Sequence, residues 1–162
     1  FFVYSQLLQN TLPQDNADPL DMYLLKKARA AKMNAYGIES LSDQLGAIAT
    51  ISVEEQAKLL LTMVADTATN TEQFDDVVNT YLAQDLAKMI ALSNDPALPS
   101  DFNLNFLNKR NEKMADRIAE LCKKETTFSA IGAAHLGGEK GVLQLLRNKG
   151  FQVEPIKFSF KQ

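Results

Sequence analysis

The sequence has 162 residues, of which 46% are hydrophobic and 23% charged, a composition typical of one soluble domain with a real core. It has 17 lysines and arginines and 20 aspartates and glutamates, so we expect no basic surface that would bind nucleic acid. The longest apolar runs are far shorter than the ~20 residues that a membrane-spanning helix needs. Cys122 is the single cysteine, so it cannot form an internal disulfide, and we expect it in the core.

Apolar residues at helical spacing predict an amphipathic helix from Leu20 to Met33. Ser40 is expected to cap a short helix. Ser52 is followed three residues later by Glu55, which is the pattern of a capping box at the start of a longer helix.

Two further helical segments are expected before the C-terminal region. One runs from about Thr71 to Leu92, with a break near Gln84-Asp85, and the other from Phe102 to Cys122. The stretch from about 50 to 122 is therefore predicted to be a helical insert.

The last 40 residues predict a different arrangement. Residues 126–132 and 151–160 have the composition of strands, and Lys140 to Lys149 that of a helix, so we expect a β-α-β unit over about 126–160. Asn34 to Ile38 is expected to be a brief strand that delivers Glu39 to its end. The predicted fold class is mixed, helix-rich α/β, in one domain over 1–162.

The chain starts with Phe1-Phe2-Val3-Tyr4, without an initiator methionine or a signal peptide, so we expect it to begin within a longer protein. The β-α-β unit would then complete a sheet whose N-terminal strands lie outside this chain. Such a sheet exposes an edge and an apolar face, so we expect either a homo-oligomer or completion by the missing N-terminal segment.

His135 is the one histidine of the chain and the strongest candidate for chemistry. It is predicted at the end of a strand and just ahead of a helix, where open α/β sheets place residues that contact ligands. Imidazole can bind a metal or transfer protons near neutral pH. A hydrogen-bonded structural histidine is an equally good interpretation of the spacing alone.

Other candidates carry less weight from the residues alone. Glu39 is predicted at a strand end like His135, but a capping or surface glutamate is the better interpretation. Arg110 and Asn111 could bind a carboxylate or phosphate, although such an arginine is more often on a solvated helix face. The glycines of Gly137-Gly138-Glu139-Lys140-Gly141 match no phosphate-binding motif and are better explained by a tight turn.

Several motifs together resemble the TraB/PrgY/GumN family, which includes the Tiki-type proteases, and the resemblance extends from about Asp18 to Pro155. The motifs are Tyr36-Gly37-Ile38-Glu39-Ser40 with Gln44, Arg110-Asn111-Glu112-Lys113-Met114, and Gly132-Ala133-Ala134-His135-Leu136-Gly137-Gly138-Glu139-Lys140-Gly141-Val142. Tyr81 to Asp85 resembles the family's Tyr-x-x-Gly-Asp, with Gln84 in place of glycine.

The resemblance implies a mixed α/β fold and a metal-dependent peptidase. Members of the Tiki type are proposed to hold a divalent ion between two Gly-x-x-His motifs and a glutamate, and the first of these motifs is missing here. By motif matching, His135 and Glu39 would be metal ligands, with Glu39 and Arg110 as catalytic residues and Arg110 and Asn111 as substrate-binding residues. The ion would be manganese, cobalt or zinc.

Our main hypothesis is therefore the C-terminal portion of a Tiki-like, metal-dependent hydrolase acting on a peptide or protein. Because many bacterial relatives look exported, an extracytoplasmic setting is expected for the parent protein. The alternative is a non-catalytic protein of the same fold that binds a peptide or another ligand, or has a regulatory role.

Overall fold

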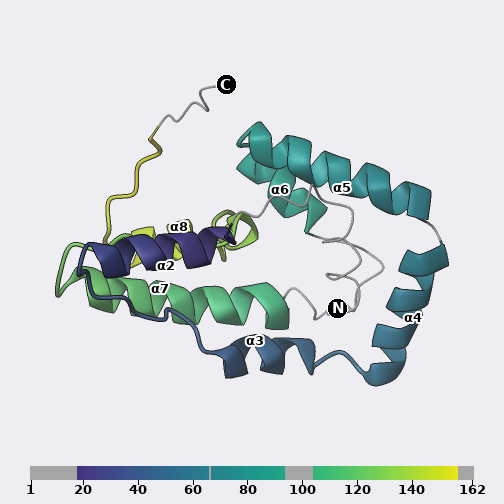
Figure 1. Cartoon of the computed structure of the whole chain (residues 1–162), viewed down its shortest axis with the longest axis horizontal. Coiled ribbons are helices and arrows are strands. Elements are labelled where there is room, and N and C mark those ends of the chain that lie inside the picture. The colour runs from purple at the N-terminus through teal and green to yellow at the C-terminus, as the bar shows by residue number, and fades with distance from the viewer. Residues whose placement is uncertain (1–17, 66, 94–103, 157–162) are drawn as a thin grey trace. The chain divides into compact units, whose positions relative to one another are not determined.

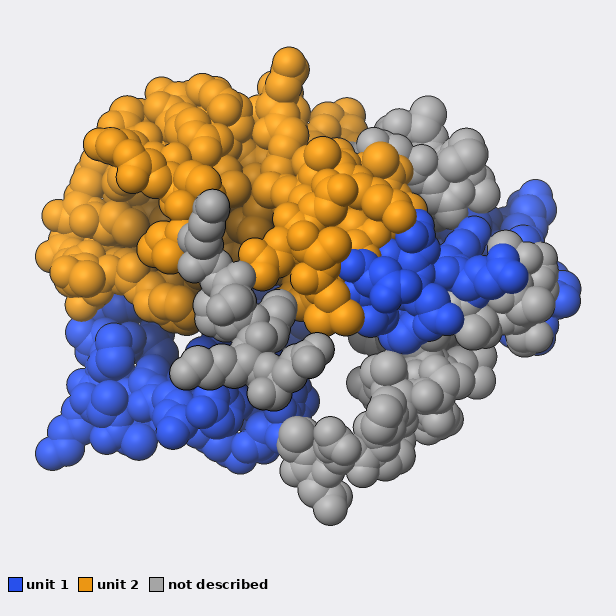
Figure 2. Space-filling view, turned by 90° about the horizontal axis from the view of Figure 1, so that it is seen from above, with its two compact units in different colours: residues 1–79 blue, residues 80–162 orange. Residues whose placement is uncertain are grey.

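The computed structural model describes residues 18–65, 67–93 and 104–156, and Figure 1 shows these residues as helices joined by irregular segments. The chain divides into two compact units, 1–79 and 80–162, which Figure 2 distinguishes by colour. Within the described ranges, no helix combines the length and hydrophobicity needed to cross a bilayer.

Among the described residues, unit 1 contains α2 (Leu20–Ala30), α3 (Leu41–Ile48), α4 (Val53–Ala65) and the larger part of α5 (Thr67–Leu82). Both predicted caps are confirmed. The hydroxyl of Ser40 accepts from the amide of Asp43 (3.1 Å), and that of Ser52 accepts from the amide of Glu55 (3.2 Å). Each acidic side chain also accepts from the amide of its cap residue, so free donors at both helix starts are satisfied.

Helices α2 and α5 end in the same way. The residue just past each end, Lys32 (φ 55°) or Gln84 (φ 56°), adopts a left-handed backbone. After α5, the amides of Gln84 and Asp85 donate to the carbonyls of Tyr81 (3.0 Å) and Thr80 (3.2 Å), which is the Schellman arrangement. The predicted break at Gln84-Asp85 is thereby confirmed, and Asp85 caps the next helix by accepting from the amide of Lys88 (2.9 Å).

Unit 2 is built around one strongly amphipathic helix. It contains α6 (Leu86–Leu92), a π-helical turn η1 (Leu104–Asn108), α7 (Lys109–Cys122), a short 3₁₀ turn η2 (Ala133–His135) and α8 (Val142–Asn148). The long helix predicted from Phe102 is thus η1 followed by α7, and residues 102–103 lie outside the described part. One face of α7 is buried, namely Asn111, Met114, Ala115, Ile118, Ala119 and Leu121. This face packs against α8, where Val142 is fully buried.

The predicted strands are wrong, and with them the sheet-completing β-α-β unit and the mixed α/β class. Residues 34–38, 126–132 and 151–156 are irregular, although the helix between the last two is present as α8. Residues 157–160 of the last predicted strand lie outside the described part. A strand requires a hydrogen-bonded neighbour, and none of these segments pairs with another within the described ranges.

Cys122 also differs from expectation. It is the last residue of α7 and is exposed, whereas its neighbour Leu121 is buried. Successive residues on a helix are rotated by about 100°, so only one of the two can face α8 and the core. The prediction of a core cysteine is therefore wrong.

Candidate functional site

The imidazole of His135 lies at the end of a short turn that follows an extended stretch. Gly132 has an extended backbone (φ −60°, ψ 139°), and its carbonyl then accepts from the amide of His135 (3.0 Å). The amide of Leu136 donates to the carbonyl of Ala133 at the same distance, 3.0 Å, which closes η2. The predicted strand end is thus a 3₁₀ turn, but it still places a half-buried imidazole just ahead of a helix, α8.

Asn111 connects His135 to the loop before α8. It lies in the first turn of α7 and is only 3% exposed. Its Oδ1 is 2.6 Å from Nδ1 of His135, and its Nδ2 donates to the carbonyl oxygen of Lys140 at 2.9 Å. A buried amide is tolerated when both of its ends have partners, and here both do.

The loop from Leu136 to Gly141 is held by close backbone packing. The amide of Leu143 donates to the carbonyl of Leu136 (3.2 Å), and that of Gly141 donates to the carbonyl of Gly138 (3.1 Å). Gly138 has φ 81°, a conformation that side chains disfavour. The side chains of Leu86 and Ile90 on α6 approach Gly137 so closely that they would have to shift to admit a Cβ. The tight-turn interpretation of these glycines therefore has a direct physical basis.

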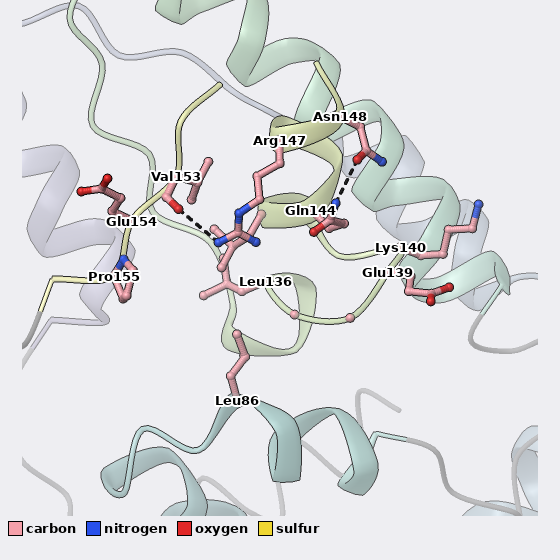
Figure 3. Close-up of a pocket in the computed structure, with 13 residues that line it drawn as sticks. Leu86, Leu136, Glu139, Lys140, Gln144, Arg147, Asn148, Val153, Glu154 and Pro155 are labelled. Atoms are coloured by element: carbon pink, nitrogen blue, oxygen red, sulfur yellow. Dashed lines mark hydrogen bonds between the residues drawn. The ribbon is translucent and has the colours of Figure 1, made fainter. Parts of the chain in front are cut away.

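A cavity of about 1100 Å³ is lined in part by Leu136, the residue that follows His135 in the chain, and Figure 3 shows its lining. Its walls come from the loop after His135, from one face of α8, from the segment 153–155 and from Leu86 of α6. Arg147 donates to the carbonyl of Val153 (3.2 Å), and Gln144 donates to Asn148 (2.9 Å), so two of its polar groups are already oriented. The lining is Leu86, Leu136, Gly137, Gly138, Glu139, Lys140, Leu143, Gln144, Arg147, Asn148, Val153, Glu154 and Pro155.

Arg110 precedes Asn111 on α7 but makes its own contacts. Its guanidinium donates to the carbonyl of Phe106 (3.1 Å) and lies 5.0 Å from the centre of the Phe106 ring, a cation-π distance. Consecutive helical residues do not share a face, so Arg110 and Asn111 point in different directions.

Glu39 lies in unit 1, in the bend that joins α2 to α3, and is half-buried. It directly precedes Ser40, the cap of α3. His135 belongs to unit 2, so a meeting of Glu39 with His135 stays a prediction.

With this geometry in view, comparison with known proteins identifies the chain. A sequence profile of the TraB/PrgY/gumN family matches residues 2–155. The chain belongs to this family. The family resemblance predicted from the glutamate, arginine and histidine motifs is confirmed.

Three similar relatives of this TraB/PrgY/gumN chain are named metalloproteases. Metalloprotease TIKI1 of Danio rerio is 24% identical over 163 residues, covering 83% of this chain and 33% of that protein. Metalloprotease TIKI2 of Xenopus tropicalis is 24% identical over 164 residues, covering 83% of this chain and 31% of that protein. Metalloprotease TIKI2 of Danio rerio is 33% identical over 88 residues, covering 52% of this chain and 16% of that protein.

The chain thus spans about a third of the length of the relatives that it matches most fully. No solved structure matches it.

Among the residues that the structure describes, no three or more His, Cys, Asp or Glu residues form a group that could hold a metal ion. A protein metal site generally needs about three such ligands. An imidazole is one of the side chains that can ligate such an ion, and that of His135 is held at Nδ1 by Asn111.

Sequence reasoning did not foresee how Asn111 is placed. It is buried between α7, His135 and Lys140, and its predicted contact with substrate stays a prediction. The signal was present in the spacing: Asn111 lies three and four residues before Met114 and Ala115, on the buried face of α7. A polar residue within an apolar stripe needs a buried partner.

Proposed function

We propose that this chain contributes His135 as a metal ligand to the active site of a metal-dependent peptidase. Membership of the TraB/PrgY/gumN family and similarity to proteins named metalloproteases support a hydrolase of this kind. The observation that carries the proposal is the imidazole itself, which is anchored through Nδ1 by a buried amide and directly precedes the wall of a cavity.

The ion, once bound, would supply a water activated for attack on a peptide carbonyl. We propose manganese, cobalt or zinc for this position. His135 would hold the ion through Nε2, and Glu39 would either act as a second ligand or take a proton from the attacking water. Arg110 would bind the carbonyl oxygen of the substrate, exchanging its hydrogen bond to Phe106 for this one.

The cavity in unit 2 would receive the substrate chain. Leu136, Leu143 and Val153 offer apolar contact for a side chain, and the loop 136–141 follows His135 directly in the chain. A peptide or protein segment in an irregular conformation would fit such an open, mixed lining.

Calorimetric titration of manganese, cobalt and zinc tests the ligand assignment. We expect the chain to bind at least one of these ions, and His135→Gln to weaken that binding at least tenfold. Lys124→Ala is the matched control, because Lys124 is exposed and its ammonium pairs with the surface residue Glu120. Equal affinity in the original chain and His135→Gln would show that His135 is not a ligand.

Cleavage of peptides separates the peptidase from its alternative. We expect metal-dependent hydrolysis that His135→Gln abolishes and Lys124→Ala leaves intact. The alternative function is a non-catalytic peptide-binding protein, which the cavity favours because all of its walls come from unit 2 and none needs a metal. Peptide binding that survives His135→Gln, without hydrolysis, would favour this alternative.

A further inference from the structure

We infer that Asn111 is a positioning residue that holds His135 in its Nδ1–H tautomer and so selects Nε2 as the atom that coordinates the metal. The tautomer follows from the contacts of Asn111 alone. Its use in metal binding rests on the proposed function.

The position of the proton follows from which atoms can donate. The carbonyl oxygen of Lys140 can only accept, so the amide group of Asn111 that faces it must be the NH₂, Nδ2. Oδ1 therefore faces His135, and an amide oxygen can only accept. Nδ1 of His135 must then carry the hydrogen of the 2.6 Å bond, so in the neutral imidazole Nε2 is the ring nitrogen without a hydrogen.

The opposite orientation of the amide is excluded by the same contacts. Turning it over would place Oδ1 against the carbonyl oxygen of Lys140, so that two acceptors would meet without a hydrogen. Because Asn111 is buried, water cannot readily enter to relieve that contact.

Both supports of the amide are themselves fixed. On one side, Met114, Ala115 and Ile118 bury the same face of α7 that carries Asn111. On the other, the carbonyl of Lys140 directly precedes Gly141, whose amide is bonded to the turn at Gly138. The asparagine thus joins α7 to the histidine turn, 24 residues away, as one unit.

This arrangement matches what metal sites require of their surroundings. A ligating histidine ordinarily donates its other ring N–H to a carboxylate or carbonyl, which fixes both its tautomer and its direction. The side-chain carbonyl of Asn111 has that role here. We therefore assign Asn111 to the support of His135 rather than to contact with substrate.

Nitrogen-15 NMR of the imidazole tests the inference directly, and the single histidine makes the assignment unambiguous. At about pH 8, where an ordinary imidazole is neutral, we expect a protonated Nδ1 and an unprotonated Nε2. A protonated Nε2 in the unsubstituted chain would overturn the inference before any variant is made.

Two substitutions then show whether Asn111 sets the tautomer. Asn111→Leu has a similar shape without hydrogen-bonding groups, so we expect it to give a mixture of tautomers. Asn111→Asp keeps an acceptor for Nδ1–H and should retain the Nδ1–H form. Met114→Ala removes packing from the same face and should also retain it. An unchanged tautomer in folded Asn111→Leu would contradict the inference.

Zinc titration of the same samples separates this inference from the proposed function. We expect zinc to perturb the Nε2 resonance, with affinity lowered about 10- to 100-fold by Asn111→Leu and largely restored in Asn111→Asp. Failure of zinc to bind, with the tautomers as expected, would refute the metal role and leave the positioning role standing. Zinc bound through Nδ1 would refute the positioning role.

Discussion

Gly141 and Gly137 approach so closely that a Cβ on Gly141 would overlap the carbonyl group of Gly137. Flexible side chains can move aside from such a contact, but a backbone carbonyl cannot do so cheaply. The contact closes the loop 136–141, and residues 136–140 of this loop line part of the cavity.

We expect Gly141→Ala to lower the free energy of unfolding by about 2–4 kcal/mol, because the backbone of 136–137 must shift. Gly150→Ala provides a comparison: Gly150 has φ 88° but open space around it, so only conformational strain of about 1 kcal/mol is expected. Urea denaturation measures both. Equal losses in the free energy of unfolding for the two variants would show that the loop accommodates the added Cβ near Gly137 without a costly backbone shift.

A third glycine should respond in the opposite direction. Gly46 lies inside α3, and nothing lies within 4 Å of the position that its Cβ would take. Gly46→Ala should therefore raise the free energy of unfolding by about 0.5–1 kcal/mol. A loss of stability would show that this face of α3 is covered.

Gln84 occupies the left-handed position that ends α5, where the family motif places glycine. A side chain in this conformation costs roughly 1–2 kcal/mol, and glycine avoids this cost. Glycine also has more conformational freedom in the unfolded chain, which offsets part of the gain in stability. We expect Gln84→Gly to raise the free energy of unfolding by about 0.5–1 kcal/mol and Gln84→Val to lower it. Thermal denaturation measures the stability of both variants. A loss of stability in Gln84→Gly would show that the glutamine side chain stabilises the fold by more than its backbone strain costs.

The helices could be predicted from the sequence because their signals are local. Ser40 and Ser52 each carry an acidic residue three positions later, and Asp85 begins α6 directly after the left-handed Gln84. Each of these signals is complete within one turn of chain. The strands failed because a short apolar run such as 126–132 forms a strand only beside another strand, and spacing along the chain does not reveal a neighbour.

The site was predictable in part for the same reason. His135 stands out as the one histidine in a glycine-rich motif, so the sequence alone marks it as a candidate. Its partner Asn111 lies 24 residues earlier and depends on how α7 packs against the loop before α8. Only the fold brings these two residues together.

Packing between α7 and α8 should contribute more to stability than the charges that join them. Val142 is fully buried at this contact, so Val142→Ala should cost about 1–3 kcal/mol. Lys149 forms an ion pair with Asp116 across the same two helices, but Asp116 is largely exposed. Lys149→Ala should therefore cost no more than about 1 kcal/mol. A larger effect for Lys149 than for Val142 would reverse this ranking, and urea denaturation of both variants measures it.

The pKa of Glu55 determines how the stability of the start of α4 depends on pH. The hydroxyl of Ser52 donates to its carboxylate (2.7 Å), as does the amide of Ser52 (3.1 Å), and these bonds hold the pKa of Glu55 below its ordinary value. A lowered pKa means that the folded state favours the charged form. Its contribution to stability is therefore complete above the unfolded pKa, about 4.3, and is lost as the pH falls through the folded pKa.

Ser52→Ala removes the stronger of these bonds and the acceptor for the amide of Glu55. We expect the pKa of Glu55 to rise toward its ordinary value and the helix to lose stability at neutral pH, with a smaller further loss below about pH 4.3. Carbon-13 NMR titration of the Glu55 carboxyl measures the first effect, and thermal denaturation at several pH values the second. Glu120 is the internal control: its pKa is lowered by Lys124 and Arg117 in unit 2, so it should not respond to Ser52→Ala. An unchanged pKa for Glu55 would mean that the cap does not stabilise its charge.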